Sequence, residues 1–580
     1  MSVDTLSPLL PAVPLLAALA GFLLPLRSRR AAAALGVAGA AAALAVAVAL
    51  AARYERAYET SLDWVRLGDL QVTLGVRVDG PATAVALAVC AVALAVQVYS
   101  VAYLRDDDRY PPYAAQVSLF TAAMLLVVVS GDLIGVLVGW EVMGACSYLL
   151  IAHDRTLPAA PRAAVKAFLV TRVGDVGFLL GIAVLGVGAG SFRIADVLAT
   201  DYAPGTLTAA CLLLLAGVAG KSAQFPLHTW LPDAMAGPTP ISALIHAATM
   251  VAAGVYAVTR LYPLFRAAPV ALTVLGVLAA VTILLGALAA TAQDDIKRVL
   301  AWSTVSQLGY MTGALAVGST SAALFHLLTH AAFKALLFLA AGCVIHAVGT
   351  NLMSAMGGLR RQLPVTFWCT AIGLGALAGL PPLAGFWSKE AILHAAVTAQ
   401  AGRGAPPVWV AWLVWLTGLL GVAVTAWYAT RLLLRTFFGP SRVPAGATSH
   451  DPPALMRWPV VLLAVPGAAL GLAAFSDTFA GRLFPPATGA VPSDLLPASH
   501  KLIHLGPELL LPLALLAAGA GLAWWRWRRA PGADPAAALP AAFAEAFRLD
   551  EVQHALVVRP VAALARVSRR ADEAGVDGLV

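Results

Sequence analysis

Charged residues are scarce in this sequence. Asp, Glu, Lys and Arg make up 12% of its 580 residues, whereas hydrophobic residues make up 60%, and the mean hydropathy is +0.83. Soluble domains carry about 25% charged residues, so the composition excludes a soluble multidomain protein. Runs of about twenty apolar residues recur along the chain, and each is long enough to cross a bilayer. The sequence therefore predicts a multi-pass membrane protein.

Cysteine is also scarce, and the five cysteines stand singly in apolar segments. They are Cys90, Cys146, Cys211, Cys343 and Cys369. Because no C-x-x-C pair occurs, the usual ligand sets for zinc and iron–sulfur clusters are missing, and we expect no cofactor and no metal on this chain. No basic cluster is interleaved with aromatic residues, so we expect no nucleic-acid partner despite the net charge of +8.

The apolar runs lack the ten-residue alternation of a membrane β-barrel, which indicates helices. We expect an all-α polytopic fold with about 15 transmembrane helices. The predicted spans are 7–26, 31–52, 80–104, 113–130, 132–152, 166–190, 206–224, 241–262, 268–292, 297–317, 321–348, 365–398, 409–435, 458–475 and 507–526. Basic residues gather in alternate joints, beginning with Arg27, Arg29 and Arg30. This bias places the N-terminus outside and the C-terminal arm in the cytoplasm, and it favours retention of the first span.

Two spans contain prolines that interrupt a helix. Pro226 and Pro232 follow Lys221, and Pro381 and Pro382 precede Lys389. Proline removes a backbone donor, so we expect each span to consist of two half-helices. Paired broken helices are typical of inverted-repeat transporters with an ion site at the breaks.

Charged residues inside the predicted spans are candidates for function, because burying a charge in a membrane is costly. Glu141 lies in GWEVMGACSYLLI, and Lys221 ends an apolar run. If Glu141 is the partner of Lys221, movement of the carboxylate would switch the lysine between holding and releasing a proton. The structural alternatives are a carboxyl group near a helix end and a lysine that reaches the interface.

The string GKS at 220–222 resembles the end of a phosphate-binding loop. That motif needs a glycine where this chain has Leu215, and an apolar helix precedes it instead of a strand. An ATPase is therefore excluded.

A second group of candidates follows helical spacing. His326, His330 and Lys334 stand at i, i+4 and i+8, which places them on one helix face. With His246 they offer groups that pass protons through intervening water. Packed neutral histidines, a zinc pair and haem ligands remain alternatives. Lys389 would be the last carrier before the surface.

Arg172 and Asp175 stand at i and i+3, and we expect a supporting ion pair. From Leu549 the apolar residues again follow helical spacing, with arginines between them. This pattern predicts an amphipathic helix that lies along a surface.

Several segments resemble the L subunit (chain 5 type) of the proton-pumping NADH:quinone oxidoreductase, respiratory complex I. They include GKSAQFPLHTWLPDAMAGPTPISALIHAATMVAAGVY, FHLLTHAAFKALLFL and GFWSKE, and the resemblance covers roughly 78–434. It implies an antiporter-like subunit at the distal end of a membrane arm, with the lipid bilayer, protons and other membrane-arm subunits as partners. It also implies a proton path along the membrane midplane through Glu141, Lys221, His246, His326, His330, Lys334 and Lys389.

The resemblance suggests four regions. They are N-terminal transmembrane helices (1–112), an antiporter-like core (113–435), C-terminal transmembrane helices (436–526), and a linker with an amphipathic helix (527–580). We expect proton transport driven by quinone reduction elsewhere in a complex, with neither NADH nor quinone bound here. The rivals are a subunit of a multisubunit cation/proton antiporter or of a membrane-bound hydrogenase complex, and a haem-bearing electron-transfer subunit.

Overall fold

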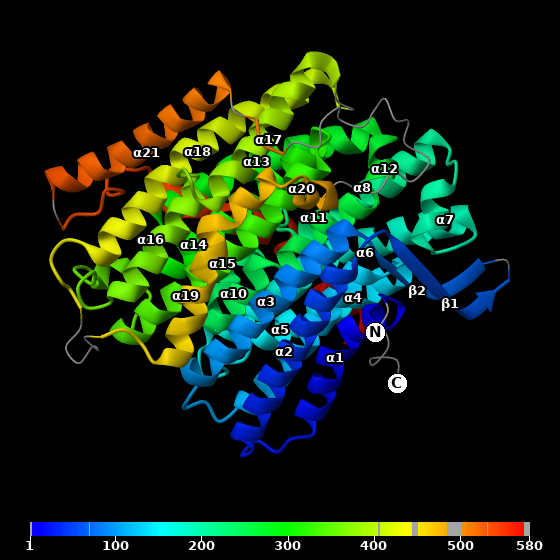
Figure 1. Cartoon of the computed structure of the whole chain (residues 1–580), viewed down its shortest axis with the longest axis horizontal. Coiled ribbons are helices and arrows are strands. Elements are labelled where there is room, and N and C mark those ends of the chain that lie inside the picture. The colour runs from blue at the N-terminus through cyan, green and yellow to red at the C-terminus, as the bar shows by residue number, and fades with distance from the viewer. Residues whose placement is uncertain are drawn as a thin grey trace.

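The protein is a bundle of helices packed side by side, with one small hairpin at its edge (Figure 1). The computed structural model describes residues 3–573 except 69, 404–405, 444–449, 484–501, 505 and 531. The long helices are α1 (Val3–Phe22), α2 (Arg29–Arg53), α3 (Gly80–Tyr103), α4 (Tyr110–Val129), α5 (Leu133–Ile151), α6 (Ala159–Ala189), α8 (Pro204–Lys221), α13 (Pro269–Ala292), α14 (Ile296–Ala316), α15 (Thr320–Val348), α18 (Val408–Phe437), α19 (Ala454–Ala469) and α21 (Leu510–Arg529). The shorter helices are α7 (Ile194–Ala199), α9 (Trp230–Asp233), α10 (Thr239–Ala247), α11 (Met250–Arg260), α12 (Tyr262–Arg266), α16 (Pro364–Ala378), α17 (Ala384–Thr398), α20 (Asp477–Leu483), α22 (Ala541–Ala544), α23 (Leu549–Gln553) and α24 (Arg559–Ala571).

Among the described residues, 13 helices are long and apolar enough to cross a membrane. They match all the predicted spans except 297–317 and 365–398. The first of these is α14, a helix of 21 residues that carries many hydroxyl and amide side chains. The second is divided into α16 and α17, which are each too short to be counted alone. The prediction of a helical multi-pass membrane protein is confirmed.

The helix breaks are more numerous than the two that proline predicts. α8 ends at Lys221, and the chain then runs without regular structure until α9. α16 ends before Gly379, whose φ of +90° closes the helix in the left-handed region. A third break, which we did not predict, separates α10 from α11 at Ala248 and Thr249. It comes directly after His246 and contains neither proline nor glycine.

The all-α expectation omitted a β-hairpin formed by β1 (Tyr58–Leu67) and β2 (Leu70–Val78). Apolar residues at every second position, Val72, Leu74 and Val76, follow the two-residue period of a strand. The charged residues of the same segment made this pattern hard to recognise in the sequence. Arg260 anchors the base of the hairpin, since its Nη1 lies 2.5 Å from Asp79 Oδ2.

Helix α15 lies at the centre of the bundle, where it packs against α3, α10, α14, α16, α17 and α19. Nearly all of its side chains are buried. A helix surrounded by other helices exposes no polar group to lipid, and this allows α15 to carry His326, His330 and Lys334.

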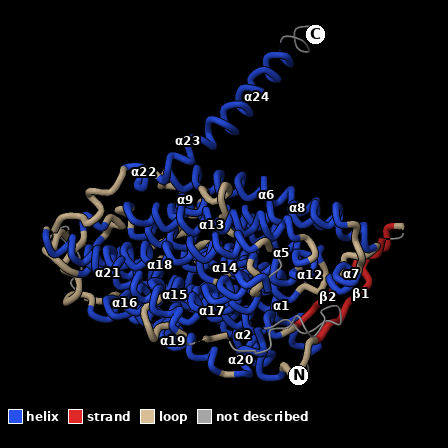
Figure 2. Tube along the Cα trace, turned by 90° about the horizontal axis from the view of Figure 1, so that it is seen from above, coloured by secondary structure: helices blue, strands red, loops and turns tan. Residues whose placement is uncertain are grey.

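The C-terminal segment ends in helices α23 and α24. α24 points away from the bundle (Figure 2), whereas α23 stays against it, since Asp550 of α23 pairs with Lys166 of α6 at 2.6 Å. The predicted amphipathic helix exists, and its docking along a surface stays a prediction. Its apolar residues Leu556, Val561, Leu564 and Val567 are exposed. The last residues of the predicted helix, 574–580, lie outside the described part.

Candidate functional site

A buried ion pair joins the end of α8 to the middle of α6. Lys221 Nζ lies 3.1 Å from Asp175 Oδ2, and the two side chains are 0% and 1% exposed. The second carboxylate oxygen, Asp175 Oδ1, accepts a hydrogen bond of 2.6 Å from Trp140 Nε1 on α5. Such a pair is stable only when further hydrogen bonds satisfy it, and Trp140 supplies one of them.

Glu141 does not pair with Lys221, so the hypothesis that considered it as the partner of this lysine does not hold. Its carboxylate forms an ion pair with Arg172, whose Nη1 also lies 3.9 Å from Asp175 Oδ2. Arg172 therefore has two acidic partners, and the predicted pair with Asp175 is the longer of these two contacts. The Glu141 and Arg172 side chains are 32% and 34% exposed at the side of the bundle. The four groups form a row of alternating charge that runs from this side to Lys221.

His326 on α15 is held through both ring nitrogens. Its Nδ1 lies 2.9 Å from Ser388 Oγ on α17, and its Nε2 lies 3.2 Å from Gln307 Oε1 on α14. A metal ion would have to bind one of these two ring nitrogens, and both already have a hydrogen-bond partner. Within the described residues, no group of three or more His, Cys, Asp or Glu side chains is placed to hold a metal ion.

The other residues of this second group also lie deep in the bundle. The His330 ring lies 6.2 Å from that of His326, and its Nε2 has no hydrogen-bond partner among the described residues. His246 is fully buried, and neither of its ring nitrogens has such a partner. Lys334 Nζ donates to the Leu300 carbonyl oxygen at 2.9 Å and to the hydroxyl of Ser303.

Helix α14 connects the two groups of candidates. Thr312 donates a hydrogen bond of 2.9 Å to Gln224, which lies three residues beyond Lys221. On the same helix, Gln307 contacts His326 and Ser303 contacts Lys334. No hydrogen bond or ion pair in the described structure joins Lys221 directly to a histidine of the second group, so the polar side chains of α14 span the gap.

Lys389 lies just beyond the break between α16 and α17. Its Nζ donates a hydrogen bond of 2.6 Å to the carbonyl oxygen of Leu377, in the last turn of α16. Carbonyl groups at the end of a helix have no partner within the helix, so the break provides this acceptor. The same Nζ lies 5.3 Å from the centre of the Tyr310 ring.

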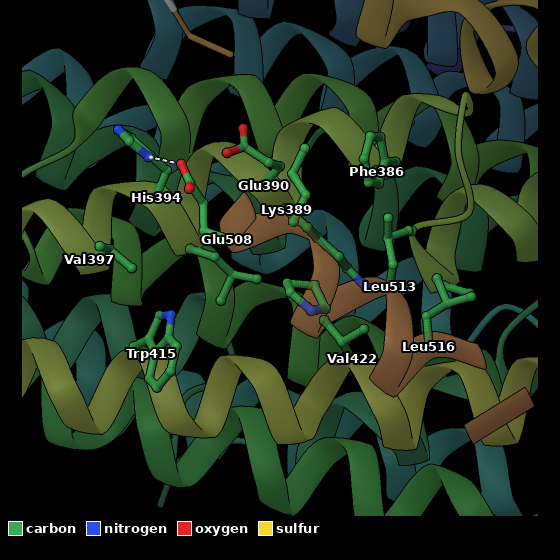
Figure 3. Close-up of a pocket in the computed structure, with 15 residues that line it drawn as sticks. Phe386, Lys389, Glu390, His394, Val397, Trp415, Val422, Glu508, Leu513 and Leu516 are labelled. Carbon is green, nitrogen blue, oxygen red and sulfur yellow. Dashed lines mark ion pairs between the residues drawn. The ribbon is translucent and has the colours of Figure 1, made fainter. Parts of the chain in front are cut away.

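A pocket opens beside Lys389, between α17, α18 and the start of α21 (Figure 3). Glu390, His394 and Glu508 line it, and His394 Nδ1 lies 3.7 Å from Glu508 Oε1. The His394 ring stacks on that of His504, with 3.7 Å between the ring centres. Lys389 thus lines a pocket that contains ionisable side chains, and its neighbour Ser388 contacts His326.

Sequence reasoning missed several members of the site: Trp140, Ser303, Gln307, Ser388, His394 and Glu508. Ser303 and Gln307 are spaced by four residues, as are Glu390 and His394, so helical periodicity carried a signal for these pairs. Glu508 carries no such signal, because it comes from a distant segment.

The chain resembles known proteins along most of its length. Residues 130–414 match the family "NADH:quinone oxidoreductase/Mrp antiporter, TM", and residues 64–114 match "NADH-Ubiquinone oxidoreductase (complex I), chain 5 N-terminus". NADH-quinone oxidoreductase subunit L of Mycobacterium tuberculosis is 41% identical over 541 residues, which cover 91% of this chain and 83% of the relative. NAD(P)H-quinone oxidoreductase chain 5 of a Picosynechococcus species is 42% identical over 453 residues, which cover 72% and 67%.

A solved structure is similar as well. The structure of an Mrp complex from a Dietzia species superposes with a TM-score of 0.78 and 28% sequence identity, and the match covers 99% of this chain. This chain spans 63% of the length of the matched Mrp chain. The broken helices, the buried charges and these likenesses define an antiporter-like, multi-pass membrane subunit. The chain belongs to the NADH:quinone oxidoreductase/Mrp antiporter family, in its branch of complex I subunit L (chain 5) proteins. The resemblance inferred from the sequence is confirmed.

Proposed function

We propose that this chain carries protons across a bacterial cytoplasmic membrane as a membrane-arm subunit of an NADH:quinone oxidoreductase. Quinone reduction elsewhere in the complex would drive the transport, and this chain would bind neither NADH nor quinone and hold no cofactor. The observation that carries the proposal is the pair of Lys221 and Asp175, a proton carrier and its counter-charge buried together where α8 ends.

The row of charges gives a way to control the proton on Lys221. Asp175 stabilises the ammonium form, while Glu141 holds Arg172 at its far side. When Glu141 releases Arg172, the guanidinium moves onto Asp175 and competes with Lys221 for its carboxylate. The ammonium then loses its counter-charge, and Lys221 passes its proton inward.

The second group supplies the rest of the route. Protons would pass along α15 through water between His246, His330, Lys334 and His326, and then to Lys389 and the pocket in Figure 3. The N-terminus lies outside and the C-terminal arm in the cytoplasm, as the loop charges predict. Other membrane-arm subunits and lipid cover the exposed apolar helices.

The experiment compares Lys221→Met with Arg162→Met, a matched change of an exposed residue on α6. Both variants are introduced into the complete complex, and proton pumping is measured in membrane vesicles after native gels confirm assembly. Lys221→Met is expected to lower pumping by at least about tenfold, and Arg162→Met leaves it unchanged. Normal pumping by an assembled Lys221→Met complex would disprove the assigned role.

A second candidate is a subunit of a cation/proton antiporter, favoured by the Mrp likeness that covers 99% of this chain. A membrane-bound hydrogenase complex is a related alternative. Mass spectrometry of the native complex captured through this chain separates these proposals. Copurified iron–sulfur and quinone-site subunits support the redox-driven pump. Purely antiporter-type partners, together with sodium-dependent pH changes without respiratory substrate, support the antiporter. A visible haem spectrum would revive the electron-transfer alternative.

A further inference from the structure

Trp140 contacts both members of the buried pair that Lys221 forms with Asp175. Its indole Nε1 donates a hydrogen bond of 2.6 Å to Asp175 Oδ1. The centre of the same aromatic side chain lies 5.7 Å from Lys221 Nζ, within the range over which an aromatic face attracts a cation. Because the indole is a hydrogen-bond donor only, Trp140 cannot carry the proton itself.

The packing of three helices fixes Trp140 in this position. Its side chain is fully buried on α5. The indole lies parallel to the Phe178 ring of α6, with 4.1 Å between the ring centres and 7° between their planes. Phe178 is itself held against α8, because a Cβ added at Gly217 would lie only 2.5 Å from the Phe178 Cβ. This packing keeps the indole N–H directed at Asp175.

The two carboxylate oxygens of Asp175 have different partners. Trp140 occupies Oδ1. Both basic groups approach Oδ2 instead, with Lys221 Nζ at 3.1 Å and Arg172 Nη1 at 3.9 Å. A carboxylate has enough lone pairs to serve one cation on each oxygen, but here Oδ1 is already taken. Two cations that crowd one oxygen repel each other, so a close approach of one favours withdrawal of the other.

Arg172 has a free donor for the other oxygen. Its Nη1 pairs with Glu141, whereas its Nε is buried and has no hydrogen-bond partner among the described residues. Guanidinium groups commonly bind a carboxylate through two donors, one to each oxygen. If Oδ1 of Asp175 were unoccupied, Arg172 could bind it while Lys221 kept Oδ2. Both cations would then be satisfied together, and Lys221 would keep its proton.

We propose that Trp140 is a positioning residue that makes Lys221 and Arg172 exclusive competitors for Asp175. This inference rests on the proposed function. The indole N–H leaves one oxygen for two cations, so that an approaching Arg172 displaces the Lys221 ammonium instead of adding a second contact. One N–H bond of the ammonium breaks, its proton passes to the next carrier inward, and no redox state changes.

The first test removes the indole N–H group. Trp140→Phe is introduced into the complete complex, and its proton pumping is compared with that of Trp427→Phe, which truncates another buried tryptophan on α18. Trp140→Phe is expected to lower pumping at least about fivefold, because hydrogen bonds to charged groups are among the stronger ones in proteins. Trp427→Phe leaves pumping unchanged. Equal pumping by the two assembled variants overturns the proposal.

The second test separates positioning from packing. Benzothienylalanine has the shape of tryptophan with sulfur in place of the N–H group, and suppression of an amber codon places it at position 140. The same codon suppressed with tryptophan is the control and pumps normally. The sulfur analogue is expected to assemble and to pump as slowly as Trp140→Phe at neutral pH. Pumping at the control rate by the analogue overturns the role of the N–H group.

The pH profile of the analogue provides a readout that a packing role would not change. When Lys221 and Arg172 bind the carboxylate together, Lys221 gives up its proton only at lower proton activity. The acidic limb of the pumping profile is therefore expected to move up by about one pH unit, with recovery at alkaline pH. An equal loss of pumping at every pH would identify a structural role and overturn the proposal.

Few charged groups act on this profile. Those that face Lys221 come from α5 and α6 and are Glu141, Arg172 and Asp175. Of the other helices that pack against α8, α13 has no charged residue, and α11 and α12 have only their last residues, Arg260 and Arg266. Arg260 is paired with Asp79.

A comparison with Lys221→Met separates this inference from the proposed function. If assembled Lys221→Met pumps normally, the proposed function fails. If Lys221→Met stops pumping while the analogue at position 140 pumps like its control, only the role of Trp140 fails. If neither Trp140→Phe nor the analogue assembles, the indole is a structural part of the bundle, and the proposal is overturned.

Discussion

Lys221 Nζ lies 3.1 Å from Asp175 Oδ2, and neither side chain is more than 1% exposed. The next cation, Arg172, has its Nη1 at 3.9 Å from the same oxygen. One carboxylate is therefore within reach of two basic groups, and a small displacement decides which of them it favours. Interactions between charges are strong in such a buried site, because little water screens them. A movement of Arg172 toward Asp175 would therefore place it in competition with Lys221 for this carboxylate.

Replacing Asp175 with Asn is expected to abolish most proton transport. The buried ammonium of Lys221 loses its counter-charge, and leaving one partner of such a pair alone costs about 3–5 kcal/mol. Lys221 then remains in its neutral form and cannot cycle. Proton uptake into vesicles should fall by at least about tenfold. Asp196→Asn is the control, since Asp196 forms a surface pair with Arg193 at 3.8 Å. Equal pumping by both assembled variants would show that Asp175 is only structural.

Adding one methyl group at Gly144 is expected to displace the Lys221 ammonium. A Cβ at this position would lie 2.7 Å from Lys221 Nζ, the movable end of a long side chain. The helices therefore keep their packing, whereas the lysine leaves its position beside Asp175. Gly144→Ala should assemble normally and pump several-fold more slowly. Gly205→Ala, on α8 with no atom within 4 Å of the added Cβ, should match the parent. Unchanged pumping by Gly144→Ala would mean that the position of the ammonium is not critical.

The sequence predicted those helix breaks that have a chemical cause in the sequence. Proline lacks a backbone donor, and so the interruptions after Lys221 and before Lys389 follow from Pro226 and Pro382. The break after His246 involves Ala248 and Thr249, both of which are compatible with a helix. Packing between helices sets that break, and no local pattern reveals it. The β-hairpin was missed because charged residues concealed its alternation.

The site residues were predictable as types but not as pairs. A charge within an apolar run is costly, so the sequence singled out Lys221 and Glu141. Which carboxylate meets which cation depends on how α5, α6 and α8 are rotated against one another. Helical periodicity gives the face of one helix but not its register against the next. The choice of Asp175 over Glu141 therefore required the structure.

Removing the hydroxyl of Ser388 is expected to loosen the contact between α15 and α17. Ser388 Oγ lies 2.9 Å from His326 Nδ1 and accepts a hydrogen bond of 2.8 Å from Thr329. Ser388→Ala leaves His326 Nδ1 buried without its partner, which costs about 1–3 kcal/mol, whereas the Thr329 hydroxyl keeps its hydrogen bond of 3.1 Å to the His326 carbonyl oxygen. The thermal stability of the purified complex should fall, and pumping with it. Thr398→Ala, at an exposed position on α17, serves as the control. An unchanged melting temperature for Ser388→Ala would show that water replaces the hydroxyl.

The docking of the linker after α21 is expected to depend on pH through Asp534. Burial alone would raise the pKa of this carboxyl, but the hydrogen bonds and charges of Arg431 and Arg435 outweigh burial and hold the pKa below its ordinary value. Because docking lowers the pKa of Asp534, its carboxylate stabilises the docked linker at pH values above the pKa of the undocked carboxyl, about 3.9. This stabilisation is lost as the pH falls through the lower pKa of the docked carboxyl. The protection of linker peptides from hydrogen exchange, measured relative to the intrinsic rate at each pH, should therefore be high at neutral pH and be lost only in strong acid.

Asp534→Asn should exchange quickly in this linker already at neutral pH, because the neutral amide cannot pair with both arginines. Glu551→Gln changes an exposed carboxyl of the same tail and should behave as the parent. If Asp534→Asn and the parent exchanged equally at neutral pH, the arginine contacts would not be what holds the linker. If the parent and Asp534→Asn both lost their exchange protection only in acid, a carboxyl other than Asp534 would control the docking of the linker.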